Sequence, residues 1–306
     1  MNKLLRAPVP SAQVGLVTRG GLRSAASSPY VPTMNERPSA VRRAIDARLG
    51  LRAPDEPSET GWIVRLPGPI MVLLAIMAFL LLASGFDFWR AGRLDTALGF
   101  VPARFAAWVG GEGAPTWGRA RPSVIGAVAP ALTHQFLHAG LGHLGVNAIG
   151  LVLFGTGVAR RLRADGSLRS GGGAANRFVF AAFFLTCGAA GALAYALLDP
   201  GSARPLIGAS GAVSGLMGGA MRFAMRRFAP YGVAEGPLAP ILSLPIIVVS
   251  GAFLATNLAT AIGAPMPFLP SGDIGWHAHI GGYLFGLLAF PWFDRLAARP
   301  ASRTYG

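Results

Sequence analysis

Six long apolar blocks constrain this chain more than any other feature of its sequence. Each is roughly 16–25 residues long, the length that an α-helix needs to cross the hydrocarbon core of a bilayer. Hydrophobic residues make up 52% of the chain and charged residues only 13%. The sequence therefore predicts an all-α membrane protein, a bundle of six transmembrane helices. The predicted spans are 69–85, 141–159, 178–198, 206–221, 238–262 and 274–293.

The positive charges predict how this bundle is oriented. The formal net charge is +14, and most Lys and Arg residues lie before the first span, after the second and fourth spans, and after the sixth. Under the positive-inside rule both termini are then cytoplasmic. We expect a multi-pass protein of the bacterial inner (cell) membrane. Its expected partner is the lipid bilayer and not nucleic acid, because the cations lie between apolar blocks.

Three parts are predicted along the chain. Residues 1–60 form a disordered basic cytoplasmic tail, 61–296 the six-helix membrane domain, and 297–306 a short cytoplasmic C-terminal tail. The first part lacks the apolar periodicity that a folded core requires. Because residues 1–34 carry Arg and Ser but no acid, an organelle transit peptide is an alternative for them, and Met34 is an alternative start.

The connection between the first two spans is unusually long, at about 55 residues. It contains Trp89, Trp108 and Trp117, a residue type that favours the membrane–water interface. We therefore expect a loop that is partly embedded at the membrane surface. An ordinary exposed loop is the alternative.

Few polar residues interrupt the apolar blocks, and those that do fall near the same end of three spans. His138, His143 and Asn147 accompany the start of the second span, Ser210 the fourth, and His279 the sixth. These three spans run in the same direction, so the five residues share one depth. Polar groups within a bilayer are costly and usually functional.

Hydrolysis is the chemistry that these residue types favour. A serine needs a general base to become a nucleophile, and His279 is suited to serve Ser210 in this way. Acyl transfer also needs donors for the developing oxyanion, and His143, Asn147 and the backbone N–H of Ser210 are suitable. Spans two, four and five contain no Asp or Glu, so a Ser-His dyad is expected and not a triad.

Small residues predict that the fourth and sixth spans pack closely. Gly211 and Gly215 are four residues apart in one span, and Gly282 and Gly286 are four apart in the other. Glycines at this spacing allow two helix backbones to approach each other. Such an approach would bring Ser210 within hydrogen-bond reach of His279, although glycine spacing alone is also typical of helix packing without chemistry.

Taken together, these motifs resemble those of the rhomboid intramembrane serine proteases, over residues 69–296. The matching pieces are His138-x4-His143-x3-Asn147, Gly208-x-Ser210-Gly211 and Ala278-His279-x2-Gly282-x3-Gly286. The resemblance implies a serine endopeptidase that cleaves membrane-protein substrates in or next to their transmembrane segments, without metal or other cofactor. It also implies that the fifth span moves laterally to admit the substrate.

The resemblance further implies a role for each motif residue. Ser210 would be the nucleophile and His279 the general base. His143, Asn147 and the backbone of Ser210 would form the oxyanion hole. Structural support would come from the remaining motif residues, His138, Gly208, Gly211, Gly282 and Gly286.

Some positions depart from the family pattern. A Trp-Arg pair is common where this chain has Ala129 and Pro130, and an aromatic that packs on the catalytic histidine is common at Ser214. A catalytically inactive, client-binding regulator is therefore the alternative function, and a transporter is a more distant one. A metal site that includes His277 is disfavoured, because no acidic base accompanies the histidines as it does in H-E-x-x-H sites.

Overall fold

The computed structural model of the chain describes residues 66–84, 94–110, 123–165, 173–225, 236–263 and 275–297. Within these ranges the fold is helical, with one isolated β-bridge and no strand. The longer segments are α2 Gly68–Ala83, α7 Leu141–Gly150 with the π-helical η2 Leu151–Gly155 and α8 Thr156–Arg161, α9 Ala174–Leu198, α10 Ser210–Ala224, α11 Leu244–Ala261 and α12 Trp276–Leu296. Three of these, Leu141–Arg161, α9 and α11, are long and apolar enough to cross a membrane.

Two of the helices begin at least four residues later than the sequence predicted. The fourth starts at Ser210 and not near 206, because Gly208 has a φ of 103° that a helix cannot contain. The fifth starts at Leu244 and not at 238. Pro240 precedes it, and the chain between 237 and 240 runs without helical structure.

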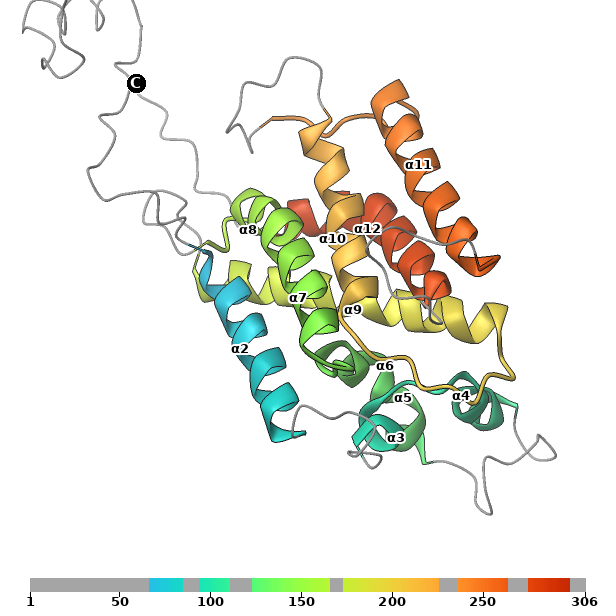
Figure 1. Ribbon diagram of the computed structural model, residues 1–306. Helices are drawn as coiled ribbons and strands as arrows, with labels where there is room; N and C mark the ends of the chain where they lie inside the picture. The colour runs from blue at the N-terminus through green and yellow to red at the C-terminus, as the bar shows by residue number, and fades with distance from the viewer. Residues whose placement is uncertain are drawn as a thin grey trace, which may run out of the picture. The chain divides into compact units, whose positions relative to one another are not determined.

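The helix α10 lies in the middle of the bundle, between α7, α9 and α12 (Figure 1). Its contact with α12 is a contact between backbones. A Cβ added to Gly282 would meet the carbonyl of Gly211, and one added to Gly286 would meet the carbonyl of Gly215. Glycine at these positions therefore sets how closely the two helices approach.

Buried aromatic side chains fill the space around α10. Phe180, Phe183 and Phe184 of α9 pack in one hydrophobic cluster with Phe290 and Phe293 of α12. Phe183 lies with its ring centroid 5.4 Å from that of Phe290. This packing fixes α9, α10 and α12 as one unit and gives the glycine contact a rigid surround.

The described part of the long connection before α7 is folded into short helices. These are α3 Leu94–Leu98, α4 Pro102–Val109, α5 Val124–Val128, α6 Pro130–Thr133 and the 3₁₀ turn η1 His134–Phe136. Both α4 and α6 contact α9. Pro130, which departs from the family pattern, occupies the first turn of α6, where its missing N–H is not needed.

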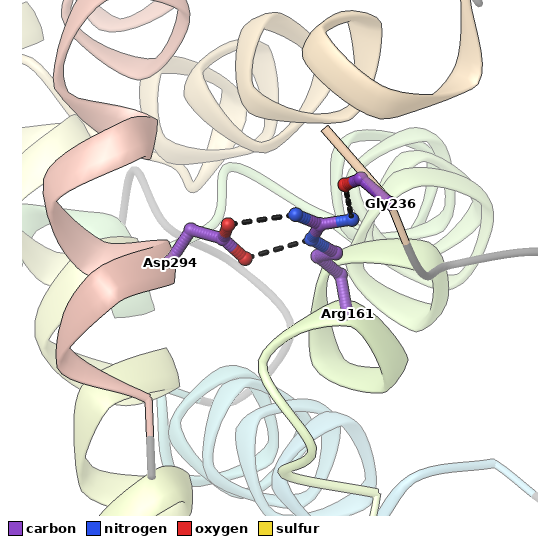
Figure 2. A network of polar contacts seen from close by, with 3 residues as sticks. All are labelled: Arg161, Gly236 and Asp294. Atoms are coloured by element: carbon purple, nitrogen blue, oxygen red, sulfur yellow. Dashed lines mark hydrogen bonds and ion pairs between the residues drawn. The ribbon is translucent and has the colours of Figure 1, made fainter. Parts of the chain in front are cut away.

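A charged network lies at the end of the bundle away from Ser210, and Figure 2 shows it. Arg161 at the end of α8 donates from Nε and Nη2 to the two carboxylate oxygens of Asp294 on α12, both at 2.7 Å. Its Nη1 also donates to the carbonyl of Gly236 at 2.8 Å. The side chains of Arg161 and Asp294 are 5% and 7% exposed, so the pair is buried.

Arg222 reinforces the same end of the bundle. Its Nε donates to the carbonyl of Ala239 and its Nη1 to that of Leu287, both at 3.0 Å. Arg161 and Arg222 lie just beyond the predicted ends of the second and fourth spans, at 159 and 221, and were therefore expected in loops, which was wrong for both. Each is part of a helix, and each is buried because backbone or carboxylate oxygens accept its N–H groups.

Several predictions lie outside the described residues. They include the disordered tail over 1–60, the C-terminal tail beyond Ala297, and the positions of Trp89 and Trp117 in the long connection.

Candidate active site

Ser210 is held at the first position of α10 by the segment that leads to it. Leu206 and Phe100 exchange backbone hydrogen bonds of 2.7 and 3.1 Å, which attaches this segment to the connection before α7. The N–H of Gly208 then donates to the carbonyl of His134 at 2.9 Å. Because Ser210 begins the helix, its own N–H belongs to the first turn, whose donors have no partner within the helix.

His279 lies in the first turn of α12 and faces Ser210 across the glycine contact. Its Nε2 is 2.8 Å from the Oγ of Ser210, and its Nδ1 is 2.9 Å from the Oδ1 of Asn257 on α11. An amide oxygen can only accept, so it requires the proton on Nδ1. The Nε2 atom is then free to accept from the serine hydroxyl, which is the arrangement that a general base needs.

Asn257 is the site residue that the sequence reasoning missed. The fifth span contains no Asp or Glu, so no third group was expected from it. The signal was present, because Asn257 is the one amide side chain in a largely apolar helix, and it is only 6% exposed. The expected Ser-His pair is therefore part of a row of three hydrogen-bonded neutral groups, in the order Ser210, His279 and Asn257.

His143 and Asn147 lie one turn apart on α7 and border the segment before Ser210. The Nδ1 of His143 accepts from the N–H of Ala139 at 3.3 Å, so the neutral ring carries its proton on Nε2. A Cβ added to Gly208 would lie 2.6 Å from that Nε2 and 3.8 Å from the Nδ2 of Asn147. Both side chains therefore lie next to Gly208, two residues before Ser210.

The amide of Asn147 is oriented by its own helix. Its Nδ2 donates to the carbonyl of His143 at 2.8 Å, and the side chain is almost fully buried. An amide nitrogen carries two hydrogens, so one remains for a ligand. His143 and Asn147 thus each place a side-chain N–H near Gly208, two residues before Ser210, and donors of this kind suit a developing negative charge.

His138 and His134 precede α7 and are buried beneath this region. The His138 ring lies 5.2 Å from that of His143 and edge-on to it. Burial lowers the pKa of His138 to about 4, with a smaller lowering from His143. Burial also lowers the pKa of His134 to about 4, although the carbonyl of Pro130 opposes the shift. Both rings are therefore neutral near pH 7. Among the described residues, neither ring forms a hydrogen bond with Ser210.

The remaining polar residues near the site make other contacts. His277 stacks on Tyr195 with ring centroids 5.2 Å apart. Ser214 is buried one turn after Ser210 and is too short to stack on His279. Within the described ranges, no three His, Cys, Asp or Glu side chains gather as metal ligands would.

A helical membrane protein in which a serine and a histidine meet at the start of two helices, beside a histidine and an asparagine on a third, is a recognisable class, and comparison with protein families identifies it. Residues 126–294, more than half of the chain, match the Rhomboid domain, so this chain belongs to the rhomboid family. All the site residues described above lie within the match. The family includes serine proteases and inactive members. No curated protein matches the chain.

Proposed function

We propose that this chain is an intramembrane serine endopeptidase that hydrolyses peptide bonds in or near the transmembrane segments of membrane-protein substrates. The observation that carries the proposal is the 2.8 Å contact between the Oγ of Ser210 and the Nε2 of His279. An inactive family member has no need of a base aligned on this serine. The second ring nitrogen is also occupied, by Asn257, so the orientation of the base is defined.

The proposed reaction follows the roles of these groups. Ser210 gives its proton to the Nε2 of His279 as its Oγ attacks the carbonyl carbon of the scissile bond. The carbonyl oxygen becomes an oxyanion and accepts from the N–H of Ser210, the Nε2–H of His143 and the Nδ2–H of Asn147. Collapse of this intermediate breaks the C–N bond, and His279 returns the proton to the leaving amine. Water, activated by the same base, then hydrolyses the acyl-enzyme.

The six long helices are proposed to span the bilayer, with both termini cytoplasmic. Large apolar side chains on their outer faces support this placement, because they would otherwise be exposed to water. Examples are Phe79 on α2 and Leu244 on α11, at 67% and 69% exposure. With Lys and Arg concentrated at the opposite end, the site would lie near the outer surface of the bacterial inner membrane. The basic tail is proposed as cytoplasmic on the same argument.

The proposal is tested with the full chain in liposomes and a labelled single-span substrate. Ser210→Ala should abolish cleavage, whereas Ser214→Ala, one turn along the same helix, should retain it. A serine-reactive fluorophosphonate should label the wild type and Ser214→Ala but not Ser210→Ala. Undiminished cleavage by Ser210→Ala would refute the proposal. A folded wild type that neither cleaves nor reacts would favour the inactive, client-binding alternative.

A further inference from the structure

The helix α11 meets the bundle along one narrow stripe of side chains. Ile246, Ser250, Phe253 and Asn257 recur at intervals of three and four residues, so they lie on one side of the helix. Only Ile246 and Asn257 are buried among the 18 residues of α11, compared with ten of the 25 residues of α9. The position of α11 therefore depends on the contacts that this stripe makes.

Two hydrogen bonds join this stripe to α12. Near the middle of α11, the Oγ of Ser250 lies 2.7 Å from the hydroxyl of Tyr283, and the Phe253 ring stacks on Tyr283 with centroids 4.5 Å apart. One turn further along, the Oδ1 of Asn257 lies 2.9 Å from the Nδ1 of His279. His279 and Tyr283 are four residues apart on one face of α12, so the bonds form one seam. One of them ends on the proposed base.

The orientation of the Asn257 amide is itself fixed. Its Nδ2 donates to the carbonyl of Phe253 at 2.9 Å, which turns Oδ1 towards His279. The reverse orientation would place two oxygens together at Phe253 and lose that bond. An acceptor held in this way keeps the ring proton on Nδ1 and directs the lone pair of Nε2 at Ser210.

We propose that Asn257 is a positioning residue for His279, which holds the imidazole so that its Nε2 faces Ser210. This inference rests on the proposed function. A third group that orients the imidazole is part of the general logic of serine hydrolysis. Here that group is Asn257, and its helix α11 is the least buried of the three helices that carry Ser210, His279 and Asn257. Displacement of α11 would remove the acceptor from Nδ1 while leaving Ser210 and His279 in their own helices.

The test compares three variants of the full chain in liposomes. Asn257→Leu keeps the volume of the side chain but removes the acceptor, and Asn257→Asp keeps an acceptor oxygen in place. Ser250→Ala removes the other α11–α12 hydrogen bond without touching His279, and serves as the matched control. For each, kcat and KM are measured on one labelled transmembrane substrate, together with thermal unfolding. Asn257→Ala replaces Asn257→Leu if the latter does not fold.

We expect Asn257→Leu to lower kcat roughly 10- to 100-fold with KM within about twofold, since a misoriented base affects the chemical step and not binding. Asn257→Asp should recover most of this loss, and Ser250→Ala should stay within about threefold of wild type. Equal losses in Asn257→Leu and Ser250→Ala, or wild-type kcat in Asn257→Leu, would overturn the inference. Neither outcome would contradict the proposed function. The proposed function fails only if the wild type does not cleave the substrate or if Ser210→Ala still does.

Discussion

The two ends of the bundle both bury polar side chains, but they partner them differently. At one end Arg161 and Asp294 form a two-bond ion pair of 2.7 Å contacts, and a backbone carbonyl takes a further N–H of the arginine. At the other, Ser210, His279 and Asn257 form a row of single bonds between neutral groups. The paired charges can only hold helices together. In the neutral row, the proton of the Ser210 hydroxyl has an acceptor in the Nε2 of His279.

This difference shows that burial of a polar group does not by itself identify a functional site. Separating a buried ion pair is costly, so a pair such as Arg161 and Asp294 is a fixed structural element. A hydroxyl bonded to a neutral imidazole costs little to rearrange, which leaves it available for reaction. If this comparison holds, substitutions at the Ser210 end should affect activity and substitutions at the Arg161 end should affect stability.

The largest effect should follow from His279→Ala. We expect cleavage to fall at least about 1,000-fold, because the serine loses its only described base. The melting temperature should change much less than the activity, since each of the two neutral hydrogen bonds of His279 contributes only about 1 kcal/mol. Cleavage assays and thermal unfolding on the same preparation measure both. Cleavage above a tenth of wild type would show that the base is a different residue.

Asp294→Ala should have the opposite result. It leaves the guanidinium of Arg161 buried beside an empty site, so the free energy of unfolding should fall by about 3–5 kcal/mol. The double variant Arg161→Met/Asp294→Leu replaces both charges with apolar groups and should recover most of the loss. Denaturation in mild detergent measures these differences. A single variant as stable as wild type would mean that this end of the bundle does not depend on the pair.

Asn147→Leu should lower kcat roughly 100-fold, because it removes one donor to the oxyanion. The KM should remain within about twofold, since the donor acts mainly in the transition state. Val146→Ala, on the exposed side of the same helix, is the control and should resemble wild type. Equal changes in kcat and KM would instead indicate a role in substrate binding.

The smallest effect should be on stability in acid. His134 and His138 have pKa values lowered to about 4 by burial, whereas an unfolded histidine titrates near 6.5. The unfolded chain therefore binds more protons between these values, and stability is lost as pH falls from 6.5 towards 4. From pH 6.5 to 5 the loss should be on the order of 2 kcal/mol for each histidine. His138→Phe cannot titrate and should lose less over this interval; an equal loss in wild type and variant would contradict the assignment.

Much of the site was predictable because its chemistry requires particular residue types at particular spacings. Ser210, His279, His143 and Asn147 stand out as polar residues at the same end of apolar spans, and all four lie within the residues that match the family. Their catalytic roles stay predictions until the variants are measured. The glycines at 211, 215, 282 and 286 also indicated which two helices approach each other, because backbone contact tolerates no larger residue.

The sequence did not predict which residue partners which across the bundle. Nothing in the neighbouring sequence marks Asn257 or Arg161 as a residue with a distant partner. Asn257 was overlooked, and Arg161 was expected in the loop after the second span. Asn257 lies 22 residues before His279, and Arg161 lies 133 before Asp294. Pairings at such separations depend on how helices rotate and tilt against one another.

By itself the sequence determined the helical membrane architecture, the rhomboid family and the polar residues of the candidate site. These follow from local properties: apolar length, charge placement and short motifs. The tertiary structure alone decided that Asn257 orients His279 and that Arg161 pairs with Asp294. A hydrogen bond needs atoms within about 3 Å of each other in a defined direction, and only the packed helices determine that geometry.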